Sequence, residues 1–164
     1  MKIRRATMEE IDDIMNMYET GRQFMREHGN QMQWIGGYPQ RELVENDCRD
    51  GRLYICEENK EPAAVFMYME GEDPNYAKIV DGAWPNDRPY GVIHRIVSLG
   101  TVKGAASFCM QWGLSQCHNL RVDTHEKNIP MQNMLEKNGF SRCGIVFMED
   151  GSPRIAFQKW DEKE

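Results

Sequence analysis

The sequence predicts an α/β domain in which a mixed β-sheet is flanked by helices. Segments with strand character and segments with helical spacing alternate along the whole chain. Residues 90–98, YGVIHRIVS, read as the strongest strand, and the last two strand-like runs read as a hairpin around Asp150-Gly151. The resulting order is strand, two helices, three strands, helix, strand, helix and two strands, which is typical of an α/β sandwich.

The first half of the chain begins with a local signal for a helix start. Thr7 and Glu10 have the spacing of a capping box, so a helix is expected directly after a short first strand. The polar turn Glu58–Glu61 separates two strand-like runs. In chain order, the predicted elements are a strand at residues 2–7, a helix ending at His28-Gly29, a loop at 30–39, a helix at 40–49, and strands at 52–57 and 62–70.

Proline and glycine mark the boundaries in the second half. Pro130 suits the first turn of a helix, and Gly139 suits the residue that follows its end. In chain order, the predicted elements are an irregular segment at residues 71–89, a strand at 90–98, a helix at 103–117, a strand at 120–124, a helix at 130–138, and strands at 140–149 and 154–160.

Composition predicts one domain, residues 1–164, that stays in the cytoplasm. A chain of 164 residues suits a single compact core. The formal net charge is −6, and basic residues are interleaved with acidic ones, so no nucleic-acid partner is expected. No apolar run is long enough to span a membrane, and the N-terminus has no apolar stretch of a secretory signal, so no membrane partner is expected either.

The spacing of cysteines and histidines favours neither disulfides nor a metal site. The 5 cysteines are an odd number and show no CxxC pair. The 4 histidines show no HxxxH or HExxH pair. We expect the thiols to be small buried apolar groups in a reducing compartment, and we expect no metal.

A glycine-bearing turn follows the strand at residues 90–98. Gly100 and Gly104 would let the backbone approach an anion closely, and Lys103 adds a positive charge at the start of a helix. Such a turn can hold a pyrophosphate, although a glycine turn before a helix is more often a simple connection. The GxGxxG spacing of a dinucleotide site is absent.

Two segments carry a resemblance to a known family. Residues 101–106, TVKGAA, match Arg/Gln-x-x-Gly-x-Gly/Ala except for Thr101, and the loop after HRIVS is about two residues short of the family's. Asn128, followed by a helix that ends in Lys137-Asn138-Gly139-Phe140, is the second match. With these segments, the chain resembles the GNAT superfamily of N-acetyltransferases over nearly its whole length.

The resemblance implies a specific architecture and a co-substrate. It implies a mostly antiparallel sheet of six or seven strands, flanked by about four helices and splayed between the fourth and fifth strands, where a pantetheine arm would lie. It implies direct acyl transfer from acetyl-CoA without a metal. The residues expected to contact the cofactor are Ile96, Val97, Ser98, Gly100, Thr101, Val102, Lys103, Gly104, Ala105, Ala106, Asn128 and Lys137.

Two histidines are candidates for the proton chemistry. His94 shares side-chain parity with Val92 and Ile96 on a strand whose face looks into the active site in resembling enzymes, so it is a candidate general base. The alternative is a core histidine bonded to a carbonyl, or one that braces the sheet together with Arg95. His125 is a weaker candidate. Family members often carry a tyrosine where this chain has Leu135, so the general acid is unassigned, with Tyr90, Tyr38 or a water as substitutes.

Three residues are candidates for acceptor binding. Trp34 and Tyr38 lie in the loop between the first two helices, where they could form a wall of a pocket or simply pack the loop down. Asp123, at a strand end, could attract a cationic substrate or could cap a turn.

The sequence therefore predicts an acetyl-CoA-dependent N-acetyltransferase that acts on a primary amine of a small molecule. Two alternatives stay open: a CoA-binding regulatory module with reduced catalysis, and an acetyltransferase of protein or peptide amines. The resemblance determines neither the acceptor, nor the length of the acyl group, nor whether the chain forms a homodimer.

Overall fold

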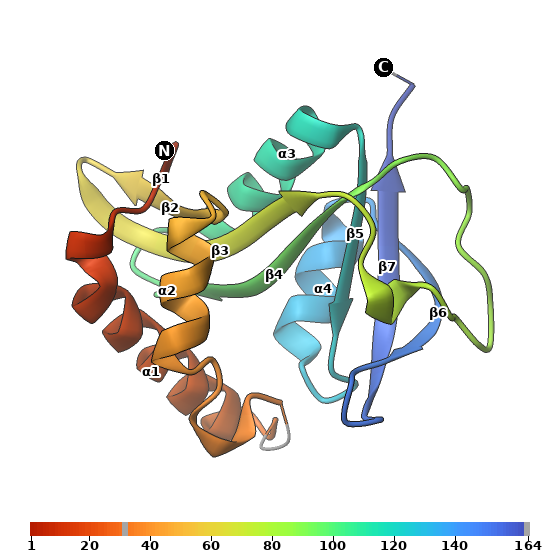
Figure 1. Ribbon diagram of the computed structural model, residues 1–164, viewed down its shortest axis with the longest axis horizontal. Helices are drawn as coiled ribbons and strands as arrows, with labels where there is room; N and C mark the ends of the chain where they lie inside the picture. The colour runs from red at the N-terminus through yellow and green to blue at the C-terminus, as the bar shows by residue number, and fades with distance from the viewer. Residues whose placement is uncertain (31–32, 163–164) are drawn as a thin grey trace. The chain divides into compact units, whose positions relative to one another are not determined.

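The computed structural model describes residues 1–30 and 33–162 (Figure 1). The described strands form one sheet in the order β1-β2-β3-β4-β5-β7-β6, mostly antiparallel with β4 and β5 parallel. This confirms the predicted mixed α/β fold. The strands are β1 (Lys2–Arg5), β2 (Leu53–Glu58), β3 (Glu61–Glu70), β4 (Gly91–Ser98), β5 (Asn119–Thr124), β6 (Ser141–Phe147) and β7 (Pro153–Trp160).

The described helices agree closely with the predicted ones. They are α1 (Ile11–Glu27), α2 (Arg41–Arg49), α3 (Ala105–Cys117) and α4 (Ile129–Lys137), with short 3-10 turns at Met8–Glu10, Ile35–Gly37 and Pro74–Tyr76. The helix predicted from residue 103 begins two residues later, because Lys103 and Gly104 form a turn in which Gly104 has a φ of 83°. In the described part of the chain, no helix is long and apolar enough to cross a membrane.

The chain divides into two compact units. The first comprises residues 1–68 and 94–109, and the second comprises residues 69–93 and those from Met110 onward. The parallel register of β4 and β5, Gly91 with Leu120 and Val92 with Arg121, belongs to the second unit. The division within β4 falls between Ile93 and His94, one residue beyond Val92, the last residue that pairs with β5.

In the first unit, apolar side chains of α1 and α2 pack with the inward face of the strands. Leu53 and Ile55 alternate inward along β2 and are nearly inaccessible to solvent. Gly21 of α1 lies so close to Val97 of β4 that any added Cβ would collide with the Val97 side chain. The core cluster comprises Ile11, Ile14, Met17, Tyr18, Val44, Leu53, Ile55, Val65 and Val97.

In the second unit, a buried arginine ties the irregular segment at residues 71–89 to β5. The guanidinium carbon of Arg121 lies 4.2 Å from the ring centroid of Trp84 and 4.1 Å from that of Tyr90. Its Nη2 donates to the carbonyl oxygen of Asn86 at 2.7 Å, and its Nε donates to Gln158. Burial lowers the pKa of Arg121. These contacts fix a segment that has little regular structure of its own.

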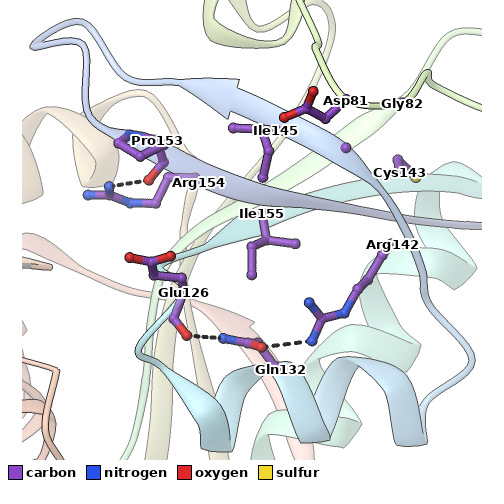
Figure 2. Close-up of a pocket in the computed structure, with 11 residues that line it drawn as sticks. Asp81, Gly82, Glu126, Gln132, Arg142, Cys143, Ile145, Pro153, Arg154 and Ile155 are labelled. Carbon is purple, nitrogen blue, oxygen red and sulfur yellow. Dashed lines mark hydrogen bonds between the residues drawn. The ribbon is translucent and has the colours of Figure 1, made fainter.

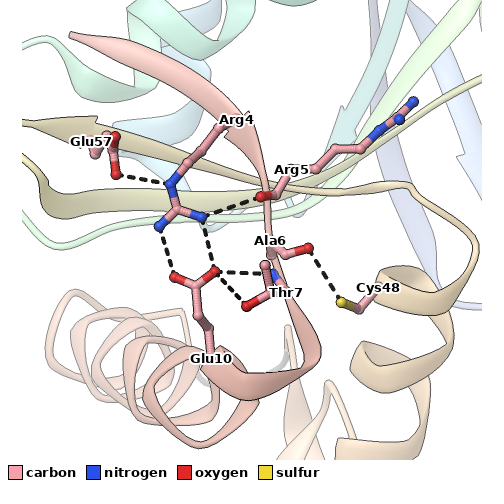
Figure 3. Close-up of polar contacts among 7 residues, drawn as sticks. All are labelled: Arg4, Arg5, Ala6, Thr7, Glu10, Cys48 and Glu57. Atoms are coloured by element: carbon pink, nitrogen blue, oxygen red, sulfur yellow. Dashed lines mark hydrogen bonds and ion pairs between the residues drawn. The ribbon is translucent and has the colours of Figure 1, made fainter.

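The predicted capping box is present and is part of a larger cluster (Figure 3). The Glu10 carboxylate accepts from the Thr7 backbone N–H at 3.0 Å and from the Thr7 hydroxyl at 3.1 Å. Arg4 donates to both Glu10 oxygens, at 2.9 and 2.7 Å, and its Nε donates to Glu57 at 2.9 Å. Charge-assisted pairing of this kind joins β1, β2 and the start of the helical segment.

The Glu10 contacts predict a defined acid sensitivity. The hydrogen bond from Arg4 lowers the pKa of Glu10 from 4.5 to about 2. A carboxyl whose pKa is depressed in the folded state contributes stability above its unfolded pKa and loses it as the pH falls toward the folded value. Glu10→Gln keeps a capping-box side chain but removes the charge, so it should cost about 1 kcal/mol at neutral pH. This cost should shrink between pH 4.5 and about 2.

Urea unfolding of both proteins across this pH range measures the effect. Glu9→Gln, at an exposed neighbouring position, is the control and should show no such trend. A cost for Glu10→Gln that stays constant down to the lowest pH would contradict the proposed charge pairing.

Candidate functional site

A buried ion pair joins α2 to β4 in the first unit. Arg95 Nε donates to Asp47 Oδ2 and Arg95 Nη2 donates to Asp47 Oδ1, both at 2.9 Å. The side chains are only 12% and 8% exposed, respectively. This geometry is the bidentate one that arginine makes best with a carboxylate.

Arg95 is held in an unusual backbone conformation. Its φ is 52°, in the left-handed region that side chains other than glycine rarely adopt, although it lies within a strand. Its carbonyl oxygen accepts from the Tyr18 hydroxyl at 2.8 Å, and its Nη1 donates to the Tyr38 hydroxyl oxygen at 3.2 Å. Partners from α1, α2 and the loop between them therefore fix this residue, as a strained conformation requires.

The buried charges of Asp47 and Arg95 fix the positions of their side chains more than they stabilise the fold. Burial raises the pKa of Asp47, with Arg95 opposing the shift. Burial also raises the pKa of Tyr18 far above its ordinary value, so its hydroxyl stays a donor. Because desolvation offsets much of the attraction, such a pair specifies position more than it stabilises the fold. His94 lies close enough to Asp47 to influence the carboxylate electrostatically.

The left-handed backbone at Arg95 also corrects the argument from strand parity. Regular alternation is interrupted between His94 and Ile96, so a shared direction of these two side chains does not follow from their spacing. His94, which is half-buried, stays a predicted base that rests on its position alone.

The conformation of Arg95 can be tested by comparing two truncations. Arg95→Ala and Arg95→Gly both remove the ion pair, but only glycine adopts a left-handed φ without strain. Arg95→Gly should therefore be more stable than Arg95→Ala by about 1 kcal/mol in urea unfolding. At Arg154, an ordinary position in β7, the order should reverse, with glycine the less stable by about 0.5–1 kcal/mol. An alanine variant at 95 more stable than the glycine one would show that the backbone there is regular.

The turn after β4, the predicted anion cradle, is open around its two glycines. Gly100 and Gly104 have φ values of 77° and 83°, and among the described residues no atom beyond the glycine and its two chain neighbours lies within 4 Å of where a Cβ would stand. The Leu99 N–H donates to Ala63 at 2.9 Å, and the Gly104 carbonyl accepts the first helical hydrogen bond of α3, from Phe108. A ligand can therefore approach this backbone closely, with the exposed Lys103 beside it.

The structure places the other predicted cofactor residues in different environments. Val97 packs its side chain against Gly21 in the core, so only its backbone can face a ligand. Asn128 caps α4, with its Oδ1 accepting from the Met131 N–H at 3.2 Å. Lys137 is exposed in the last turn of α4. The turn residues Thr101 and Val102, the exposed Ser98, the half-buried Ile96 and Ala106 and the buried Ala105 complete the set.

Trp34 and Tyr38 pack against the first helix. The Trp34 ring lies 5.7 Å from the Tyr18 ring, edge to face, and 6.2 Å from the Tyr38 ring. Since Arg95 donates to the Tyr38 hydroxyl, this phenol is already engaged. The packed-loop alternative is thus present in the structure, and a substrate contact of these half-buried rings stays a prediction.

The second unit holds the other two predicted residues. His125 is 8% exposed, and its Nδ1 accepts from the Lys127 N–H at 3.1 Å. Burial lowers the pKa of His125, and the Arg154 charge lowers it further. Asp123 accepts at Oδ2 from the buried Tyr76 hydroxyl at 2.6 Å. Burial and the Asp123 charge raise the pKa of Tyr76 well above its ordinary value, so this phenol is a donor to the carboxylate.

Sequence reasoning missed Tyr18, Asp47 and Tyr76. Each is joined to its partner across 47 or more residues, and no local motif marks such a pairing. The one signal available was Asp47 on the amphipathic helix α2. A carboxylate on the buried face of a helix requires a cationic partner, here Arg95. Within residues 1–30 and 33–162, no group of three or more His, Cys, Asp or Glu side chains is arranged to hold a metal ion.

Comparison with known proteins decides the family. A solved GNAT-family acetyltransferase from Streptococcus agalactiae is 34% identical to this chain, with a TM-score of 0.89, over 99% of this chain and 96% of its own. The chain belongs to the GNAT family. No family model matches the chain, and no curated protein matches it.

More distant acetyltransferase structures share the fold. A GNAT-family acetyltransferase from Bacillus cereus is 22% identical, with a TM-score of 0.63, over 99% of this chain and 98% of its own. The protein yncA from Salmonella typhimurium, solved with its cofactor acetyl-CoA, is 12% identical, with a TM-score of 0.61, over 99% of this chain and 95% of its own. The fold of this chain is thus shared by structures of low sequence identity to it.

Proposed function

We propose that this GNAT protein transfers an acetyl group directly from acetyl-CoA to a primary amine of a small molecule. The observation that carries the proposal is the turn at residues 99–104, where two left-handed glycines with open space around them precede α3. In a chain of this family, such a turn fits the phosphates of coenzyme A. A Cβ on either glycine would occupy the space that the ligand needs.

The chain contributes three favourable features to phosphate binding. Backbone N–H groups at the start of α3 are unpaired within the helix and carry the positive end of its dipole. Lys103 adds a full charge beside them. The pairing of the Leu99 N–H with Ala63 anchors the start of the turn to β3. Thr101, in place of the family's Arg or Gln, leaves the backbone and Lys103 to supply most of the attraction.

The acetyl thioester supplies the activated acyl group. The acceptor amine must lose a proton to attack, and His94 is the proposed group that receives it. The new C–N bond forms as the C–S bond breaks, and the thiolate takes a proton from water. A thiol has a pKa near 8.5, so the departing thiolate needs little help from a general acid. This agrees with the buried Leu135, at a position where family members often carry a tyrosine. Asp123, held by Tyr76, is the proposed attractor of the ammonium form of the substrate.

The cradle is tested by two substitutions of equal shape. Asn and Asp both tolerate a left-handed φ better than other side chains, so Gly104→Asn and Gly104→Asp share their steric effect and differ in charge. Gly104→Asp should weaken CoA binding by at least about tenfold more than Gly104→Asn does, or roughly 1.4 kcal/mol, because the carboxylate repels phosphate. Calorimetric titration with CoA gives both constants. Equal affinities of the two variants would remove the phosphates from this turn.

The role of His94 is tested by its pH profile. If His94 takes the proton, kcat/KM should rise with pH, and His94→Gln should flatten that rise and lower the rate by about 10²-fold. CoA affinity should change little, since the cradle begins beyond the end of β4. A variant that keeps the wild-type rate and profile but melts at a lower temperature would assign His94 to structure alone.

A CoA-binding module without turnover is the second candidate. Leu135 and Thr101 favour it, because both depart from the family's pattern at positions that serve catalysis or phosphate binding. This candidate predicts that acetyl-CoA raises the melting temperature while no amine is acetylated. An acetyltransferase of protein or peptide amines would instead modify a peptide amine in preference to small ones.

A further inference from the structure

The second unit contains a hollow that the proposed transfer reaction does not use. Its volume is about 750 Å³, in the range of small-molecule sites. Figure 2 shows it between the β6–β7 hairpin and the first turns of α4. The residues that line it are Asp81, Gly82, Glu126, Gln132, Arg142, Cys143, Gly144, Ile145, Pro153, Arg154 and Ile155.

One wall of the hollow carries a preorganised guanidinium. Arg142 Nε donates to Glu136 and its Nη2 donates to the Gln132 side-chain oxygen, both at 2.8 Å. Its guanidinium carbon lies 5.6 Å from the ring centroid of Phe157. In the described part of the chain, no partner is recorded for Arg142 Nη1. The group is therefore oriented before any ligand arrives, which reduces the entropy cost of binding.

A single buried amide connects this wall to the opposite one. Gln132 is 5% exposed, and its Nε2 donates to the carbonyl oxygens of Glu126 at 2.8 Å and His125 at 3.1 Å. Its oxygen accepts from Arg142, so the two walls have a fixed separation. Figure 2 shows the Glu126 carboxylate on the far side of Gln132 from Arg142. Among the described residues, no ion pair is recorded for this exposed carboxylate.

The middle of the hollow is apolar, and its rim is electrically balanced. Ile155 lies between the two charged walls in Figure 2, with Ile145 above it. Burial raises the pKa of the Cys143 thiol to about 11, so it adds no charge at neutral pH. Asp81 and Arg154 contribute one further charge of each sign. A rim with two cations and two anions favours neither a plain anion nor a plain cation.

We propose that this hollow binds a short peptide-like zwitterion, with its ammonium at Glu126, its carboxylate at Arg142 and its apolar middle over Ile155. Glu126 and Arg142 lie on either side of Gln132 and differ in charge, so a ligand that pairs with both carries two charged groups several bonds apart. The site requires no acetyl-CoA, so it goes beyond the proposed transfer reaction.

Matched ligands test both ends of the zwitterion. The full chain, without acetyl-CoA, is titrated with dialanine, N-acetyldialanine and dialanine amide, and binding is followed by NMR shifts of residues around the hollow. Dialanine should bind, and each blocked ligand should bind about fivefold more weakly, the effect of losing one partly exposed charge contact. Absence of dialanine shifts at millimolar concentration, or equal binding of all three ligands, would overturn the proposal.

Two variants assign each end to its residue. Glu126→Gln should abolish the preference for dialanine over N-acetyldialanine and keep the preference over the amide. Arg142→Gln should do the reverse. Exposed Glu9→Gln and Arg41→Gln, which make the same charge changes in the first unit, should keep both preferences. Preferences unchanged in the Glu126 and Arg142 variants would also overturn the site, and because no acetyl-CoA is present, this outcome is independent of the transfer reaction.

Discussion

The ion pair between Arg95 and Asp47 is the constraint on which the first unit depends. A charged residue with a left-handed φ in the middle of a strand is unfavourable by itself, and so is a buried carboxylate. The bidentate pairing offsets both costs, because it gives the buried Asp47 carboxylate a cationic partner and holds the backbone of Arg95 in its left-handed conformation. Tyr18 and Tyr38 complete the arrangement by bonding the carbonyl and the guanidinium of Arg95.

This constraint has consequences for the proposed site. Arg95 stands next to His94 and three residues before Ser98, where β4 ends and the glycine turn begins. Fixing Arg95 therefore fixes where the proposed base lies and where the cradle starts. The same contacts hold Tyr38, and with it the loop between α1 and α2. In the proposed direct transfer, orientation would supply much of the rate, and a chain with Leu135 in place of a tyrosine would rely on such positioning the more.

Local features could be predicted from the sequence, and nonlocal ones could not. The capping box of Thr7 and Glu10 and the glycines of the turn are encoded within a few residues, so spacing alone identified them. The order of strands and helices followed from periodicity for the same reason. Asp47 with Arg95 and Tyr76 with Asp123 join residues 48 and 47 positions apart, and only the folded chain brings them together. Strand parity does not carry past Arg95, because tertiary contacts impose a backbone conformation there that no propensity predicts.

Direct transfer is the central claim, and it is tested most directly with acetyl-CoA labelled in the acetyl group. The full chain is incubated with the labelled compound and a panel of small primary amines, and the products are identified by mass spectrometry while free thiol is followed. The account predicts that labelled N-acetyl product appears for at least one amine, in equal amount to the released CoA, and that the protein itself carries no label. Labelled protein on the path to product, or CoA binding without any acetylated amine, would contradict it.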